Sequence, residues 1–168
     1  ARYLKEEGAN LVFSDINGAK LAEIREELGG EIVDGPDYYG LDCDVLAPCA
    51  IGAVINKNTI PQLRAPIIAG GANNILEHEE RDSQNLAERQ ITYAPDYVIN
   101  GGGLISVNAE LRGWPKEKAM TDATGIFDTV KAILTSSKTR NVTTMEAANQ
   151  LALERLQTVS RIKDIYNS

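Results

Sequence analysis

The sequence predicts an α/β domain built on a parallel sheet, with further helices towards its C-terminal end. Two observations carry this prediction. Short apolar runs alternate with helical segments through the first hundred residues, as in βαβ units. The most informative stretch, Tyr93 to Leu104, is a short apolar strand that leads through Asn100 into three successive glycines and then a helix. Such a turn lets a flat cofactor approach the backbone closely, which indicates a dinucleotide-binding domain.

The first half of the chain divides into short strands and helices. Gly8 closes an opening helix, and Gly29 with Gly30 closes the second, because glycine is common just past a helix end. Small-residue turns mark the ends of the apolar runs. Strands are expected at residues 10–14, 31–34, 44–47 (buried), 65–69 and 97–99, and helices at 1–7, 19–28, near 59–61 as a short turn, and at 81–89 on the surface.

After Leu104 the pattern becomes helical. Pro115 suits the first turn of a long helix. Thr143 and Glu146 have the spacing of a capping box, in which each side chain accepts a bond from the other residue's backbone N–H. Two sets of apolar residues recur every three or four positions, which is typical of helices that pack in a core or an interface. They are Ala119, Met120, Ala123, Ile126, Phe127, Val130, Ile133 and Leu134, and then Met145, Ala148, Ala152, Leu156, Val159, Ile162 and Ile165.

Composition excludes several classes of function. The 168 residues are 43% hydrophobic, which is enough for one domain with a core. A net charge of −7 without a basic run argues against nucleic-acid binding. No apolar stretch approaches the roughly 20 residues of a membrane span. Cys43 and Cys49 match no zinc pattern and are expected to be free thiols in a cytoplasmic protein. The single histidine, His78, is interpreted as a surface residue, and no metal site is predicted.

The chain begins within a helix, at A-R-Y-L-K-E-E-G-A. In a Rossmann half, this helix follows the first strand and the G-x-G-x-x-G phosphate turn. Neither precedes it here, and the glycines at 101–103 come too late and lack the spacing. The prediction is therefore a Rossmann-type parallel sheet with C-terminal helices that lacks its first strand and glycine-rich turn. Residues 1–168 are expected to form one N-terminally truncated domain.

Four of the expected strands end in polar or small residues. Ligands of open parallel sheets lie beyond the carboxyl ends of the strands, so these residues should line one crevice. Asp15 ends the first strand, where its carboxylate can accept bonds from both hydroxyls of an adenosine ribose. It would also repel a 2′-phosphate, which favours NAD over NADP. Alternatively, Asp15 only caps the helix that follows.

The other three strand ends each have a functional and a structural interpretation. The A-P-C-A segment at 47–50 is small enough for an adenosine or ribose to pass, or it packs as a tight loop. The run at 69–74 offers two amides to a ribose or a carboxylate, or it is a turn. Asn100 offers an amide to a nicotinamide carboxamide, or it occupies a left-handed turn position.

Five segments taken together resemble a known family. They are D-I-N, A-P-C-A-I-G-A-V-I-N, T-I-P-Q-L, I-I-A-G-G-A-N-N and Y-A-P-D-Y-V-I-N-G-G-G, in this order along nearly the whole chain. They closely resemble the cofactor domain of the leucine, phenylalanine, valine and tryptophan dehydrogenases, which are relatives of glutamate dehydrogenase. The resemblance implies an NAD-dependent enzyme that reversibly deaminates a branched-chain or aromatic L-amino acid to a 2-oxo acid and ammonia.

The resemblance also implies a role for each matching residue. In the order of the cofactor from adenine to nicotinamide, these are Ile16 on the adenine side, Asp15 on the adenosine ribose, Cys49 and Ala50 near the ribose, Ala72 and Asn73 at the nicotinamide ribose or the substrate carboxylate, Asn100 at the nicotinamide amide, and Leu104 beside the substrate side chain. The family more often has N-A-G-G-V where this chain has N-G-G-G-L at 100–104. The choice of amino acid therefore stays open.

No catalytic residue is implied within this chain. The family's catalytic lysines and aspartate belong to an N-terminal domain, so the isolated fragment is expected to be inactive. Two alternatives stay open: a non-catalytic nucleotide-binding or interaction module derived from such an enzyme, and another Rossmann oxidoreductase such as a glutamate dehydrogenase, which A-P-C-A and G-G-G disfavour. The long C-terminal helices are expected to pack against the absent domain or a partner subunit, and the parent enzyme is expected to be a homo-oligomer.

Overall fold

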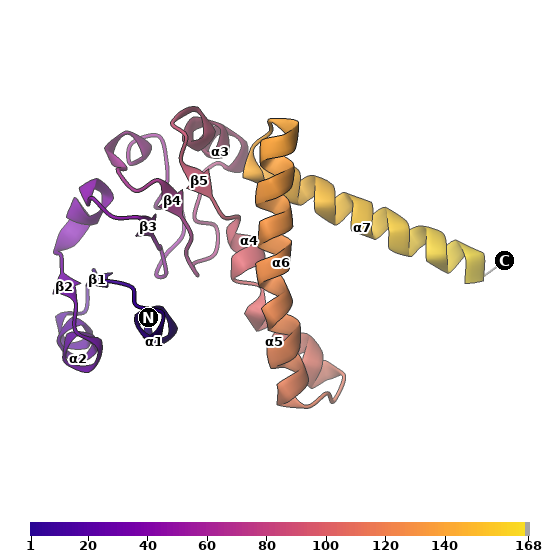
Figure 1. The fold of residues 1–168 in the computed structure, drawn as a ribbon, viewed down its shortest axis with the longest axis horizontal. Coiled ribbons are helices and arrows are strands. Elements are labelled where there is room, and N and C mark those ends of the chain that lie inside the picture. The colour runs from indigo at the N-terminus through magenta and orange to yellow at the C-terminus, as the bar shows by residue number, and fades with distance from the viewer. Residues whose placement is uncertain (167–168) are drawn as a thin grey trace.

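The computed structural model describes residues 1–166, and the side chains of residues 1–160. Within this part of the chain the strands form two parallel sheets (Figure 1). In the first, β1 (Val12–Phe13) pairs with β2 (Glu31–Ile32). In the second, β4 (Ile67–Ile68) lies between β3 (Val45–Leu46) and β5 (Thr92–Tyr93). Every pairing is parallel, which confirms the predicted α/β, Rossmann-type architecture.

Helices and short 3-10 turns connect these strands. The predicted N-terminal helices are present with ends shifted by one or two residues. Asn17 caps the second helix, because its side chain accepts a 3.1 Å bond from the Lys20 backbone N–H, and Gly29 ends that helix at a φ of 68°. The turn η1 was not expected. The elements are α1 (Arg2–Glu6), α2 (Gly18–Leu28), η1 (Gly35–Gly40), η2 (Ile60–Gln62) and α3 (Glu79–Glu88).

The predicted strand at 97–99 is wrong. These residues belong to a short helix, α4 (Asp96–Ile99), and the strand is β5, four residues earlier in the chain. Pro95 lacks an N–H and so suits the start of a helix, and the Asp96 carboxylate accepts a 2.7 Å bond from the Tyr97 N–H. The apolar run thus packs as a helix against α6 instead of extending the sheet.

The main core surrounds β4. Ile68 on that strand is fully buried. It belongs to one hydrophobic cluster with Ile55, Ile75 and Leu86, which are also fully buried. Truncating a large aliphatic side chain in such a core costs about 2–5 kcal/mol, so this cluster holds the loops on either side of β4 in place. Val45 on β3 is 46% exposed, so the expectation that this strand is buried was wrong.

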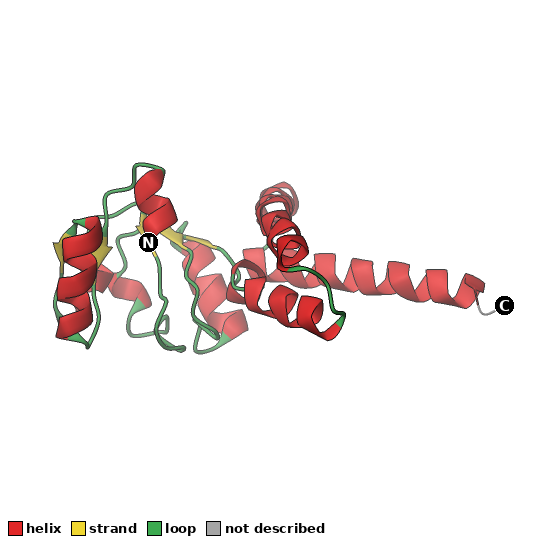
Figure 2. Cartoon of the chain, turned by 90° about the horizontal axis from the view of Figure 1, so that it is seen from below, coloured by secondary structure: helices red, strands yellow, loops and turns green. Residues whose placement is uncertain are grey.

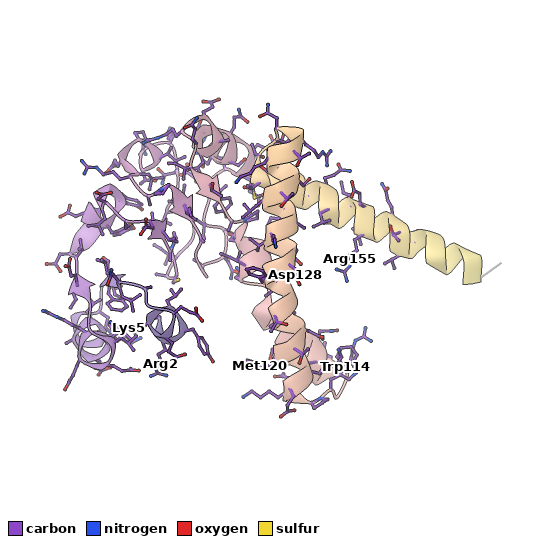
Figure 3. The ribbon with its side chains drawn as sticks, viewed as in Figure 1. Arg2, Lys5, Trp114, Met120, Asp128 and Arg155 are labelled. Carbon is purple, nitrogen blue, oxygen red and sulfur yellow. The ribbon has the colours of Figure 1, made fainter. Side chains whose placement is uncertain are left out.

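Three helices form the C-terminal part: α5 (Gly102–Leu111), α6 (Lys116–Arg140) and α7 (Thr144–Tyr166). Figure 3 places the labelled Met120 and Trp114 at the end of α6 that lies beside α5. The cationic groups of Arg112 and Lys118 lie 5.0 and 4.6 Å from the centre of the Trp114 ring. These cation–π contacts hold the turn between the two helices.

The predicted capping box at the start of α7 is confirmed. Thr143 N–H donates to Glu146 Oε2 at 2.8 Å, and Glu146 N–H donates to Thr143 Oγ1 at 3.1 Å. Beyond its first turns α7 leaves the rest of the molecule, as two perpendicular views show (Figures 1 and 2). Leu156 and Val159 of the predicted apolar stripe are exposed, and the side chains of Ile162 and Ile165 lie outside the described residues. Within residues 1–166, no helix combines the length and apolarity that a membrane crossing requires.

Candidate functional site

Two loops meet at the carboxyl ends of β3 and β4. They can approach this closely only because glycine stands at the crossing points. A methyl group placed on Gly70 would lie 2.0 Å from the Pro48 carbonyl oxygen, and one on Gly52 would lie 2.7 Å from the Asn73 carbonyl oxygen. The Ala72 N–H also donates to the Pro48 carbonyl, at 3.0 Å. The small residues that the sequence analysis singled out therefore serve close packing of one loop on the other.

Asn100 joins the same place from the end of α4. Its side-chain Nδ2 donates to Asn73 Oδ1 at 2.6 Å and to the Ala72 carbonyl at 3.3 Å. Asn74, which follows Asn73 in the chain, has a φ of 52°, in the left-handed region. The described residues give no partner to Asn73 Nδ2 or to Asn100 Oδ1. The pair therefore offers a ligand one free amide donor beside one free carbonyl acceptor.

Cys49 and Ala50 lie in the loop that follows β3 and are both exposed. The Cys49 Sγ accepts a 3.4 Å bond from the Gly71 N–H, so the thiol lies directly on the second loop. Cys43 is half-buried on the approach to β3, and burial, followed by the charges of Asp44 and Asp42, raises the pKa of its thiol. Both cysteines are free, as predicted.

Asp15 and Ile16 lie in the other sheet, just past the end of β1. Asp15 Oδ1 accepts a 2.8 Å bond from the Asn17 N–H, so the carboxylate supports the turn into α2. Asp15 is exposed, and no hydrogen bond to its Oδ2 occurs among the described residues. Ile16 is fully exposed, with a large apolar side chain and no covering residue. No hydrogen bond among the described side chains joins these two residues to the Asn73–Asn100 pair.

The glycines at 101–103 adopt a different conformation from the one expected. Gly101 has a φ of −60°, and α5 begins at Gly102, so the run lies in helical backbone and not in a turn that precedes a helix at Leu104. Asn100 itself has a φ of −91°, which excludes the left-handed turn interpretation. Leu104 lies in the first turn of α5 and is 77% exposed, with Val107 and Leu111 also exposed on the helix.

Ala72 occupies the core and not the surface. It is 5% exposed and packs with the residues around β4. Its N–H and its carbonyl are already bonded, to Pro48 and to Asn100 respectively. Ala72 thus holds the neighbouring Asn73 in place, while its own side chain is unavailable to a ligand.

Asp96 was not singled out from the sequence, although it stands out as one acidic residue within the apolar run Y-A-P-D-Y-V-I. It is 6% exposed and bonds the backbone of both α4 and the loop after β4. Beside it, Tyr93 is 2% exposed, and burial, followed by the charge of Asp96, raises the pKa of its phenol well above the usual value. Among the described residues, no group of three or more His, Cys, Asp or Glu side chains could hold a metal ion.

Comparison with known proteins identifies the relatives of this chain. The family model for the glutamate, leucine, phenylalanine and valine dehydrogenases matches residues 5–163. The chain belongs to this dehydrogenase family. Leucine dehydrogenase of Geobacillus stearothermophilus is 45% identical over 162 residues, which are 96% of this chain and 44% of the relative. L-Tryptophan dehydrogenase of Nostoc punctiforme is likewise 45% identical, over 96% of this chain and 46% of its own length.

Solved structures of the dehydrogenase family agree with the fold. The crystal structure of L-tryptophan dehydrogenase from Nostoc punctiforme superposes with a TM-score of 0.91 at 45% identity, covering 94% of this chain and 48% of that one. A glutamate dehydrogenase from Thermus thermophilus, 21% identical, shares the fold with a TM-score of 0.64 over 96% of this chain and 50% of that one. The chain spans less than half the length of the curated relatives it matches.

Proposed function

We propose that residues 1–168 are the NAD-binding portion of an NAD-dependent L-amino-acid dehydrogenase. The whole enzyme would convert a branched-chain or aromatic L-amino acid reversibly to a 2-oxo acid and ammonia. The observation that carries this proposal is the Asn73–Asn100 pair, which presents one free donor and one free acceptor at the carboxyl ends of parallel strands. A nicotinamide carboxamide carries the complementary acceptor and donor.

The other predicted residues fit different parts of the same cofactor. Asp15 has a free carboxylate oxygen for the adenosine ribose, and the exposed Ile16 offers apolar surface to the adenine. Cys49 and Ala50 border the path between them and the amide pair. When bound, NAD supplies the acceptor for the hydride that leaves the α-carbon of the amino acid. The chain's own contribution is to bind and orient this group.

On the substrate side we assign Asn73 and Leu104. Asn73 Nδ2 carries two hydrogens, so it can donate to a substrate carboxylate as well as to the nicotinamide. The exposed Leu104 provides an apolar wall for a branched or aromatic side chain. We assign no catalytic residue to this chain. The proton-transferring groups are expected in the part of the enzyme that the curated relatives have in addition, so residues 1–168 alone are expected to be inactive.

Two further proposals concern the whole protein. The free thiols of Cys43 and Cys49 support a cytoplasmic location, because disulfides are rare in that reducing compartment. The exposed Leu153, Leu156 and Val159 on α7 support a homo-oligomer or close packing against another domain, since an apolar helix face gains from being covered.

The experiment that tests this function is an assay of the full-length enzyme with a panel of L-amino acids, following NADH formation. Leucine, valine, phenylalanine and tryptophan are the informative members, with glutamate as the control for the other branch of the family. We expect turnover of at least one of the first four. NAD binding without turnover of any amino acid would indicate a non-catalytic nucleotide-binding module instead.

A further inference from the structure

Asp96 is a buried carboxylate whose two oxygens hold two different segments. Oδ2 accepts a 2.8 Å bond from the Ile75 N–H in the loop after β4, and Oδ1 accepts a 2.7 Å bond from the Tyr97 N–H in α4. Asp96 is itself the first residue of α4, so the Tyr97 bond supports the start of its own helix, and the Ile75 bond joins that helix to the loop. The carboxylate therefore connects the loop after β4 to α4.

The two segments that Asp96 connects, the loop after β4 and α4, carry the two amides of the pair. Asn73 lies two residues before Ile75, and Asn100 is the last residue of the turn that begins at Asp96, since its N–H donates to the Asp96 carbonyl at 2.9 Å. The 2.6 Å bond between Asn100 and Asn73 is a second connection between the loop and the helix that Asp96 already joins. A shift at Asp96 would thus change the separation of the two amides.

The chemistry of the site requires a carboxylate. An amide has one acceptor oxygen, and its NH₂ group would oppose one of the two N–H donors. No cation pairs with Asp96 among the described ion pairs, so the burial of its charge is offset by hydrogen bonds, chiefly the two N–H bonds that it accepts. Replacing the carboxylate would leave one of these two N–H donors without its acceptor, which would loosen the loop from α4.

We propose that Asp96 is a positioning residue for the cofactor: it sets the placement of Asn73 and Asn100 by anchoring the loop after β4 to the start of α4. This inference rests on the proposed function, because it assigns the amide pair to nicotinamide. It adds a residue that does not touch the ligand.

The test measures NAD affinity in the full-length enzyme and in Asp96→Asn. The control is Asp82→Asn, because Asp82 is also a buried carboxylate that accepts a 2.8 Å bond from a backbone N–H, that of His78, but it belongs to α3 and pairs with Arg81. We expect Asp96→Asn to raise the Kd for NAD about tenfold, as misplacement of binding groups does, and Asp82→Asn to leave it within about twofold. Equal effects of the two variants on Kd would overturn the proposal.

A double-mutant cycle separates positioning from general destabilisation. If Asp96 acts through Asn100, Asp96→Asn should weaken NAD binding far less in an Asn100→Ala background than in the wild type. Full additivity of the two losses would contradict the proposal. If Asp96→Asn does not fold, Asp96→Ser takes its place, because it removes the buried charge and retains one acceptor. Failure of the wild type to bind NAD would instead refute the proposed function and this inference with it.

Discussion

Asp15 shows how one side chain at the site has both a structural and a proposed functional role. One oxygen accepts the Asn17 N–H and supports the turn into α2, and the other has no partner among the described residues, in a residue that is exposed. The capping interpretation and the ribose interpretation are thus compatible, because a carboxylate has acceptors for both. Choice between NAD and NADP should depend on the charge of this residue, while the fold depends only weakly on it.

Asp15→Ala is expected to weaken NAD binding about tenfold, because bonds to a charged acceptor contribute about 1.5–3 kcal/mol. It should weaken NADP binding less or not at all, since repulsion of the 2′-phosphate is removed. The measurement is the Kd for each cofactor in the full-length enzyme. Asp128→Ala makes the same charge change on α6 (Figure 3), an element to which the proposal assigns no cofactor contact, and serves as control. An unchanged preference for NAD would remove Asp15 from the site.

At the scale of the element, the loops after β3 and β4 depend on glycine at one crossing point. The Gly70 Cα faces Pro48 so closely that a methyl group would overlap the carbonyl oxygen, whereas a methyl on Gly71 would meet only Cys49 Sγ, at 3.8 Å. Neither glycine has a positive φ, so the two positions differ in space and not in backbone strain.

Gly70→Ala is therefore expected to lower the free energy of unfolding by about 1–3 kcal/mol, the usual cost of overpacking. Gly71→Ala should change it by less than about 0.5 kcal/mol. Chemical denaturation of both variants measures the difference. Comparable stability of the two variants would show that the loops do not approach as described.

The capping box gives a second test at this scale. Thr143→Ala removes the acceptor for the Glu146 N–H at the start of α7, and such a loss costs about 1 kcal/mol. Thr139→Ala, on the exposed face of α6, is the control, because its hydroxyl only bonds the carbonyl one turn back. We expect a lower thermal midpoint for Thr143→Ala alone; similar midpoints for both variants would contradict the role of the cap.

The sequence predicted elements well where a local signal was strong. Gly29 and the Thr143–Glu146 box each specified a helix boundary through short-range bonding, and the structure confirms both. It failed at 97–99, because an apolar run of three residues is compatible with a strand or a helix and tertiary packing decides between them. Asp96 was missed for a related reason: its partner Ile75 is 21 residues away, and no local pattern reveals that bond.

At the scale of the whole molecule, parallel pairing brings together residues from distant parts of the chain. Cys49, Asn73 and Asn100 follow different elements, and the topology of the three-stranded sheet places them in one cluster. Asp15 follows β1 in the separate two-stranded sheet. The central claim is that one NAD molecule extends from Asp15 past Cys49 to the amide pair.

Alkylation of Cys49 tests this claim most directly, because the thiol is exposed midway along the proposed path. Iodoacetamide labelling of the full-length enzyme, followed by mass spectrometry, reports Cys49 and Cys43 in the same experiment. Cys43 is the internal reference, since burial raises its pKa and keeps it slow to react. Saturating NAD should slow the labelling of Cys49 and leave that of Cys43 unchanged. Labelling of Cys49 at the same rate with and without bound NAD would contradict the account.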